Sequence, residues 1–181
     1  MLRQLLVVIC LLCGLPAGAN ACWNDVALRH RVPADLLYAV AKVESGLDPK
    51  AVNRSHFHRT RSIDIGLMQI NSRHLPRLAR EGITEASLYE PCTNLDVGAR
   101  LLADLFARKG LSWDSVGAYN AACTELKGEA CTEARSRYAW KVYRQLPGNR
   151  PKTHQHVGKN RAETRPVARP TIPMLAVRVA P

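Results

Sequence analysis

The stretch LLYAVAKVESG, residues 36–46, joins an apolar, helix-like run to a single acidic side chain. It ends in Glu44, Ser45 and Gly46, so the carboxylic acid closes the run just before a residue that commonly ends helices. Apolar surroundings disfavour the charged form of a carboxyl group and raise its pKa, as general acid catalysis near neutral pH requires. The alternative is a solvated acid on the polar face of a helix.

Pro33 and Gly46 mark the ends of the helix that this stretch predicts, over residues 34–44. Proline is tolerated in a first helical turn because the N–H group that it lacks would have no partner there. Glu44 would then lie in the last turn, at the negative end of the helix dipole, where a carboxylate is disfavoured. Burial and the dipole therefore both favour the protonated acid.

Most of the remaining segments between residues 22 and 146 also read as helices. Helices are predicted over residues 23–30, 73–80, 95–107, 113–121 and 133–145. Their expected N-terminal caps are a capping-box variant at residues 93–96, Ser112 and Thr132. Residues 50–71 break this pattern with scattered β-branched residues and predict a small, irregular β-hairpin. The predicted fold is mainly α with one modest β excursion.

The two ends of the chain differ from this central part. Residues 1–21 combine an apolar run with small-x-small cleavage signatures, which is typical of a secretory signal peptide. The run is well short of the ~20 residues that a transmembrane helix needs, so no stable membrane span is expected. Residues 147–181 hold six prolines and seven basic residues against one acid, which predicts a disordered tail. The globular domain is expected over residues 22–146, in the periplasm.

The net charge of +11 favours acidic partners. Export from the cytoplasm argues against nucleic acid and favours the anionic cell wall or a membrane surface. A tail that is merely solvated is the alternative.

Four cysteines remain once the signal peptide is removed, and an even number in an exported chain suggests two disulfides. Three connectivities are open. The favoured one joins Cys123 to Cys131 as a local staple and Cys22 to Cys92 as a long tie. No Cys-x-x-Cys pair remains for zinc, and the His-x-His pairs lack further ligands at suitable spacing, so neither a metal nor another cofactor is expected.

Three further clusters accompany Glu44 and Ser45: GLMQIN at residues 66–71, AYNAA at 118–122 and RYAW at 137–140. In this order and at these separations the clusters resemble the lysozyme-like soluble lytic transglycosylases of the bacterial cell wall, over residues 22–146. The resemblance implies a lysozyme-like α+β fold with the hairpin beside the active-site cleft. Where the family usually continues Tyr-Asn with Ala-Gly, this chain has Ala121 and Ala122, which leaves the local turn open.

The same resemblance implies roles for individual residues. Glu44 would be the catalytic acid and base, and peptidoglycan glycan strands the substrate. The residues expected to bind the substrate are Ser45, Gly66, Met68, Gln69, Tyr119, Asn120 and Tyr138. Met68 and Tyr138 also have an alternative reading as ordinary core residues.

Glycoside hydrolases commonly use two carboxylates, but neither Asp48 nor Asp64 matches a second catalytic position. The resemblance therefore implies that Glu44 acts alone, with the substrate's N-acetyl group assisting and a 1,6-anhydro ring closing without water. Two alternatives stay open: a hydrolytic goose-type-like lysozyme, and a peptidoglycan-binding subunit without turnover.

The Cys-Trp start, DIGLMQINS at residues 64–72 and PCTNL at 91–95 are similar to the specialised transglycosylases of secretion machines. A short enzyme with a basic, proline-rich extension is most similar to the TrbN proteins of conjugal transfer, within type IV secretion. Type III secretion and pilus systems are the alternatives. The tail would then dock onto the machine or onto anionic wall polymers.

Overall fold

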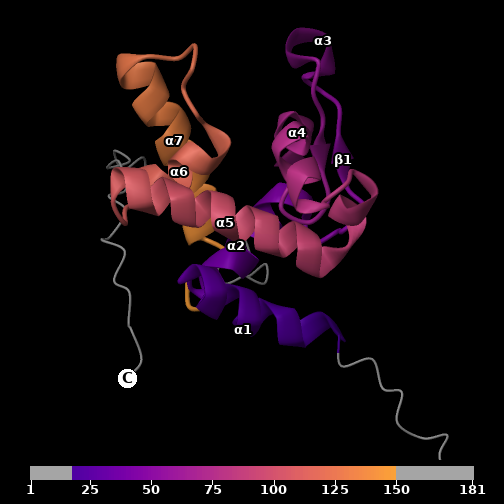
Figure 1. Cartoon of the computed structure of the whole chain (residues 1–181). Coiled ribbons are helices and arrows are strands. Elements are labelled where there is room, and N and C mark those ends of the chain that lie inside the picture. Colours follow the sequence, from indigo (N-terminus) through magenta and orange to yellow (C-terminus); the bar gives the residue numbers. More distant parts are fainter. Residues whose placement is uncertain (1–17, 150–181) are drawn as a thin grey trace, which may run out of the picture.

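The computed structural model describes residues 18–149. The expected signal peptide, apart from its last residues, and the expected tail beyond residue 149 lie outside the described residues. Four longer helices form the frame of the described part, together with the shorter α6 (Figure 1). Their bounds are α1 Gly18–His30, α2 Ala34–Ser45, α5 Pro91–Lys109, α6 Trp113–Asn120 and α7 Gly128–Tyr143.

The long helix α5 runs through the middle of the fold (Figure 1) and packs against α1 on one side and α6 on the other. α2 packs against both α1 and α7. It does so through an apolar face whose members are all buried: Leu36, Leu37, Ala39, Val40 and Ala41. Burial of this face holds the end of α2, and with it Glu44, in the centre of the domain.

α6 and α7 make an unusually close contact at Gly117. A Cβ atom placed there would lie 2.5 Å from the backbone oxygen of Arg135. Only glycine permits this approach, because any side chain would push the two helices apart. The contact sets the relative position of the two helices that carry Tyr119 and Tyr138.

Residues 50–71 form a three-stranded antiparallel sheet in the order β1-β2-β3, so the expected hairpin was incomplete. The strands are β1 Val52–Asn53, β2 Asp64–Ile65 and β3 Ile70–Asn71, with the short helix α3 Phe57–Thr60 between the first two. Val52 pairs with Ile65, and Ile65 pairs with Ile70. In Figure 1 this sheet and α3 project from one end of α5, away from α7.

Several of the expected helix boundaries were wrong, beginning with α1, which starts at Gly18 instead of residue 23. The predicted helix over 73–80 is broken into the 3-10 turn η1 Ser72–His74, the short α4 Leu75–Leu78 and the turn η2 Ala79–Glu81. A further 3-10 turn, η3 Ala86–Tyr89, precedes α5. α7 begins at Gly128, so Thr132 lies inside it and donates to the oxygen of Gly128 at 3.3 Å instead of capping the helix.

The capping box expected at residues 93–96 is also wrong, because α5 begins at Pro91. Glu90 is held in an extended conformation, φ −82° and ψ 121°, as expected of a residue before proline. Pro91 then opens the helix without losing a hydrogen bond. Ser112, by contrast, caps α6 as predicted and accepts from the N–H of Ser115 at 3.2 Å.

Both favoured disulfides are present, which confirms the predicted pairing. Cys22 of α1 is joined to Cys92 of α5 across a Cα–Cα distance of 5.8 Å. Cys123 is joined to Cys131 across 5.6 Å, closing the loop between α6 and α7. No helix among the described residues is long and apolar enough to cross a membrane.

Candidate active site

Glu44 lies in the last turn of α2, as the sequence predicts, with its side chain largely withdrawn from solvent. The hydroxyl group of Tyr138 on α7 donates a hydrogen bond to its Oε1 atom. Burial is the main cause that raises the pKa of Glu44 to about 7; the negative charge of Asp64 adds to it, while the Tyr138 bond and the positive charge of Lys141 act in the opposite direction. The carboxyl group is thus poised to exchange a proton near neutral pH.

Tyr138 of α7 and Tyr119 of α6 both lie near Glu44 at the end of α2. Tyr138 is only 4% exposed, and burial raises the pKa of its hydroxyl well above the usual range, with the charge of Glu44 adding to the effect. Burial likewise raises the pKa of Tyr119, whose hydroxyl donates to the backbone oxygen of Met68 at 3.0 Å. Both phenols therefore stay protonated and act as hydrogen-bond donors.

Ser45 connects the end of α2 to residues 66–69, the GLMQ segment. Its Oγ atom contacts the backbone oxygens of Leu67 and Ala41 at 2.8 and 3.2 Å as a donor, and it accepts from the N–H of Leu47 at 3.1 Å. The hydroxyl group is thus engaged within the protein. Ser45 holds the GLMQ segment beside Glu44.

Gly66 begins a tight turn with φ +75°. A Cβ atom at this position would lie 2.4 Å from the Nδ2 atom of Asn94 and 2.5 Å from the backbone oxygen of Leu88. The resemblance implied that Gly66 binds the substrate, which would require a glycine where the backbone approaches the glycan closely. The structure gives a different reason, since the space is filled by the protein's own Asn94.

Met68 and Gln69 complete the turn. Met68 is fully buried, so its side chain packs in the core as the alternative reading proposed, and only its backbone reaches Tyr119. The side-chain amide of Gln69 donates to the backbone oxygens of Gly66 and Ala51 at 2.9 and 3.2 Å. Gln69 itself has φ +50°, so left-handed residues, Gly66 and Gln69, stand at the two ends of the turn that holds the buried methionine.

Asn94 is the residue that the sequence analysis missed. It is fully buried, accepts from the N–H of Met68 at 2.7 Å, and donates to the oxygens of Ile65 and Leu88 at 2.9 and 2.7 Å. The sequence placed Asn94 in the expected cap at residues 93–96, just before the predicted helix, so its local signal indicated a different role. From α5, Asn94 fixes the backbone of the turn that faces Tyr119.

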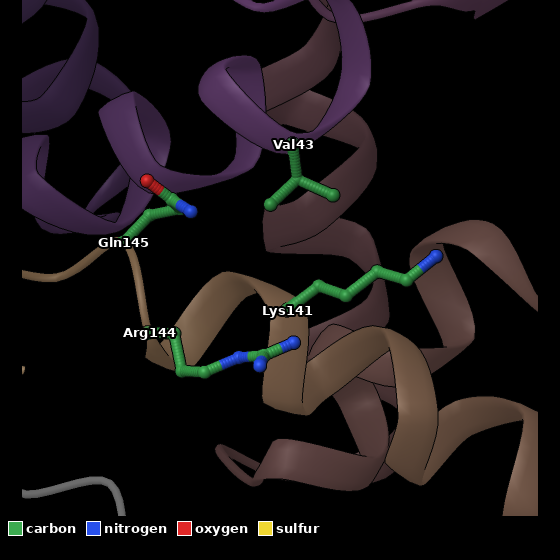
Figure 2. A pocket seen from close by; sticks show the side chains of 4 residues that line it. All are labelled: Val43, Lys141, Arg144 and Gln145. Carbon is green, nitrogen blue, oxygen red and sulfur yellow. The ribbon is translucent and has the colours of Figure 1, made fainter. Parts of the chain in front are cut away.

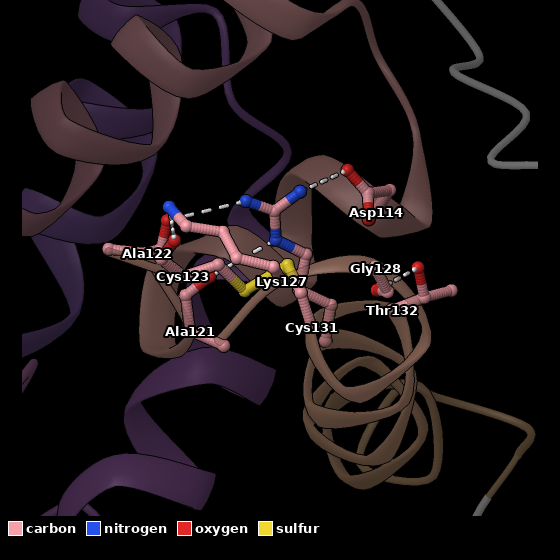
Figure 3. The surroundings of a disulfide bond; sticks show 9 residues. Asp114, Ala121, Ala122, Cys123, Lys127, Gly128, Cys131 and Thr132 are labelled. Carbon is pink, nitrogen blue, oxygen red and sulfur yellow. Dashed lines mark hydrogen bonds and ion pairs between the residues drawn. A yellow bond between two sulfur atoms is a disulfide. The ribbon is translucent and has the colours of Figure 1, made fainter. Parts of the chain in front are cut away.

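Asn120 is exposed at the end of α6, and no hydrogen bond joins its side chain to the other predicted site residues that the structure describes. The loop after it is nevertheless held firmly, as Figure 3 shows. Arg135 of α7 donates to the oxygens of Ala121 and Ala122 at 3.1 and 3.5 Å and pairs with Asp114 at 3.0 Å. The left-handed residue of this turn is Cys123, with φ +60°.

A pocket of about 330 Å³ lies between the C-terminal ends of α2 and α7 (Figure 2). It is lined by Val43, Lys141, Arg144 and Gln145. Val43 directly precedes Glu44, and Lys141 follows Tyr138 by one helical turn. No group of three or more metal-binding side chains occurs in the described part of the chain.

Comparison with known proteins identifies related sequences across most of the chain. Invasion protein IagB of Salmonella typhimurium (strain SL1344) is 40% identical over 147 residues, which cover 79% of this chain and 87% of that protein. Protein IpgF of Shigella flexneri is 37% identical over 139 residues, covering 76% and 87%. A putative peptidoglycan-binding-like protein of Escherichia coli (strain K12) is 34% identical over 138 residues, covering 72% and 84%.

Among solved structures, an inactive mutant of lytic transglycosylase Slt from Pseudomonas aeruginosa has the same fold, with a TM-score of 0.54 at 19% identity. The likeness covers 72% of this chain but only 23% of that much longer chain. It confirms the lysozyme-like architecture expected from the sequence. The family model described as Transglycosylase SLT domain matches residues 21–141. The chain therefore belongs to the transglycosylase SLT domain family of lytic transglycosylases.

Proposed function

We propose that this protein is an active lytic transglycosylase that cleaves the β-1,4 bond between N-acetylmuramic acid and N-acetylglucosamine and leaves a 1,6-anhydro product. The observation that carries the proposal is the Glu44 carboxyl group, which is largely withdrawn from solvent, has its pKa raised to about 7 and accepts a hydrogen bond from Tyr138. A general acid is most effective when its pKa lies near the working pH.

Glu44 performs both proton transfers. Because Tyr138 donates to Oε1, the acidic proton is carried by Oε2, which passes it to the glycosidic oxygen as the C1–O bond breaks. The N-acetyl carbonyl oxygen of the muramyl residue stabilises C1. The Glu44 carboxylate then removes the proton of the C6 hydroxyl, O6 bonds to C1, and the acid is regenerated without consuming water.

Asp64 is a second carboxylate near Glu44, and its negative charge raises the pKa of Glu44. Its oxygens are occupied, since Asn71 donates to it at 2.7 Å and Asn53 at 3.3 Å. A carboxylate held in this way is poorly suited to attack the sugar, which favours the substrate-assisted route. Activation of a water by Asp64 would instead give the hydrolytic, goose-type-like lysozyme.

The remaining site residues are assigned by their positions. We assign substrate contacts to Asn120, which is exposed, and to Gln69 and Tyr119, which stay partly exposed although each also hydrogen-bonds within the protein, with Tyr138 orienting the acid. Ser45, Gly66 and Met68 contribute through the backbone that they hold in place, because their side-chain positions are taken up within the protein.

The products of digested peptidoglycan test this mechanism. Mass spectrometry of the muropeptides released by the purified mature protein should show anhydro ends, and Glu44→Gln should lose nearly all activity while remaining folded. Asp64→Asn is the matched carboxylate variant and should retain the anhydro product. Hydrated reducing ends that disappear in Asp64→Asn would establish a lysozyme instead.

A binding subunit without turnover is the second candidate function, and one observation favours it. A related protein of Escherichia coli O157:H7, 35% identical over 133 residues, is named as peptidoglycan-binding-like. A zymogram decides between the two, because a subunit that only binds would leave the embedded peptidoglycan intact.

We further propose that the enzyme acts in the periplasm and opens the wall locally for a conjugation or type IV secretion apparatus. A relative named as an invasion protein supports a dedicated task over general wall turnover. The basic tail, residues 147–181, would dock onto the machine or onto anionic wall polymers. Deleting the tail should reduce transfer efficiency or wall binding while leaving cleavage of isolated peptidoglycan unchanged; no loss of either would refute the docking role.

A further inference from the structure

The pocket between α2 and α7 has an unusual combination of linings. Two of its four residues, Lys141 and Arg144, are cationic, Gln145 carries an amide, and Val43 is apolar. In Figure 2 the charged ends of Lys141 and Arg144 extend toward the same side, below Val43. The pocket therefore offers positive charge, a hydrogen-bonding group and an apolar wall within one small volume.

These two cations have no ion-pair partner among residues 18–149. Some arginines of the described part are paired, Arg29 with Asp96, Arg100 with Glu81, Arg135 with Asp114 and Arg137 with Glu133, whereas others, such as Arg108, have no ion pair there either. Cations in the last turn of a helix offset the negative end of its dipole, which accounts for their presence on α7. It does not account for their sharing a pocket with the end of another helix.

The charge balance in the pocket favours an anion. The C-terminal ends of α2 and α7 each contribute about half a negative charge, whereas the two side chains contribute a full positive charge each. The sum of these helix-end and side-chain charges is positive, and this positive charge lies beside Glu44. The charge of Lys141 is felt by Glu44, and Val43 is its neighbour in the chain.

We propose that this pocket is a subsite for the carboxylates of the peptide stem carried by the muramyl residue of the substrate. The inference rests on the proposed function, since it assumes a peptidoglycan strand across Glu44. The sugars of the strand are neutral, so the carboxylates of the stem are the anions that such a strand brings next to the cleaved bond. Gln145 can bond to a peptide group of the stem, and Val43 can contact its small apolar side chains.

Binding measured in the full mature chain carrying Glu44→Gln tests the subsite without turnover and without any effect through the pKa of Glu44. Three disaccharide probes are compared by calorimetry: one with a tetrapeptide stem, one with the same stem fully amidated, and one without a peptide. The stem with free carboxylates should bind most tightly. Each cation should contribute about two- to fivefold in affinity, as expected for exposed ion pairs, and less at high salt.

Adding Lys141→Gln and Arg144→Gln should remove the preference for free carboxylates over the amidated stem and leave the peptide-free probe unchanged. Arg108→Gln is the matched control, because it also removes an exposed cation from the last turn of a helix, α5. Equal binding of the charged and amidated probes by the parent protein, or an unchanged preference in the double variant, overturns the inference. Anhydro products from the active enzyme would then leave the proposed function standing, whereas their absence would remove the proposed function regardless of these affinities.

Discussion

At the scale of single residues, the chemistry depends on how the surroundings of Glu44 balance. Burial and the charge of Asp64 raise the pKa of Glu44, whereas the Tyr138 hydrogen bond and the charge of Lys141 lower it, and the resulting pKa is about 7. The sequence predicted the upward push from the apolar run before Glu44. It could not predict the size of the opposing effects, because Tyr138 and Lys141 lie on a helix about a hundred residues further along the chain.

Replacing Tyr138 by Phe should raise the pKa of Glu44 above its present value. The hydrogen bond from Tyr138 stabilises the carboxylate form, so removing the hydroxyl leaves burial and Asp64 less opposed. The alkaline limb of the pH profile of kcat/KM, where the acid is lost, should move to higher pH. Tyr143→Phe, on the same helix, is the control, and an alkaline limb that stays in place or moves down would contradict the assignment.

Glu44 should also cost the protein stability at neutral and higher pH. Its pKa is raised from 4.5 in the unfolded chain to about 7 in the fold, so the native state binds more protons between these values and loses stability as pH rises through them. The full penalty above pH 7 is roughly 3 kcal/mol, and it is absent below pH 4.5.

Glu44→Gln should therefore match the parent protein in urea unfolding at acid pH and exceed it by up to that amount at pH 8. Glu85→Gln changes an exposed acid outside the site and should show no such pH-dependent gain. A Glu44→Gln protein that is less stable than the parent at pH 8 would mean that the carboxylate is not destabilised by burial.

At the scale of elements, Asn94 shows how one helix shapes the loop of another part of the chain. Sequence rules placed residues 93–96 at a helix start, because Thr and Asn are common caps. In the fold Pro91 opens α5, and Asn94, one turn in, is turned toward the GLMQ segment. The tertiary contact outweighs the local propensity, since Asn94 hydrogen-bonds to three backbone groups outside α5.

Asn94→Ala should destabilise the protein by about 3 kcal/mol or more, because it removes three hydrogen bonds in the core, with the Met68 N–H and with the oxygens of Ile65 and Leu88. Activity should fall with stability, since the backbone oxygen that Tyr119 contacts belongs to the same turn. Chemical unfolding and a peptidoglycan assay measure both effects. Asn24→Ala, at an exposed position of α1, should change stability by less than about 0.5 kcal/mol.

At the scale of the whole molecule, the two disulfides act over different spans. Cys22–Cys92 joins residues 70 apart and ties α1 to the start of α5, whereas Cys123–Cys131 joins residues 8 apart. The long tie closes most of the sheet and α2 into one loop of the unfolded chain. The short staple acts only on the loop that follows Asn120.

The pair of alanine replacements at Cys22 and Cys92 should lower the free energy of unfolding more than the pair at Cys123 and Cys131. The chain-entropy model gives about 4 kcal/mol for the long loop and about 2.5 kcal/mol for the short one. Each double variant serves as the other's control in denaturant unfolding. A larger loss of unfolding free energy in the Cys123 and Cys131 variant would mean that this disulfide contributes mainly through native contacts such as those of Arg135 (Figure 3).

The helices were accessible from the sequence because they depend on local features, whereas for the cysteines the sequence left three pairings open and only favoured the one that the structure shows. Apolar periodicity located α2, and Ser112 correctly marked the start of α6. The predicted helix boundaries were wrong where the sequence offered two competing start signals, as with Pro91 and the cap expected at Thr93. The third strand and the breaks around α4 were missed because short segments carry too little periodicity to be assigned.

By itself, the sequence determined the position of an acid at the end of an apolar helix, the order of the motifs and the even number of cysteines expected in the mature chain, since each is a property of neighbouring residues or of their spacing. Only the tertiary structure decided which groups surround that acid. Tyr138, Asp64 and Lys141 come from two distant elements. They act on Glu44 because α2 packs against α7 and Ser45 at its end bonds to Leu67 between β2 and β3, which brings their charges and donors close. Electrostatic effects depend on distance in space, which sequence spacing does not specify.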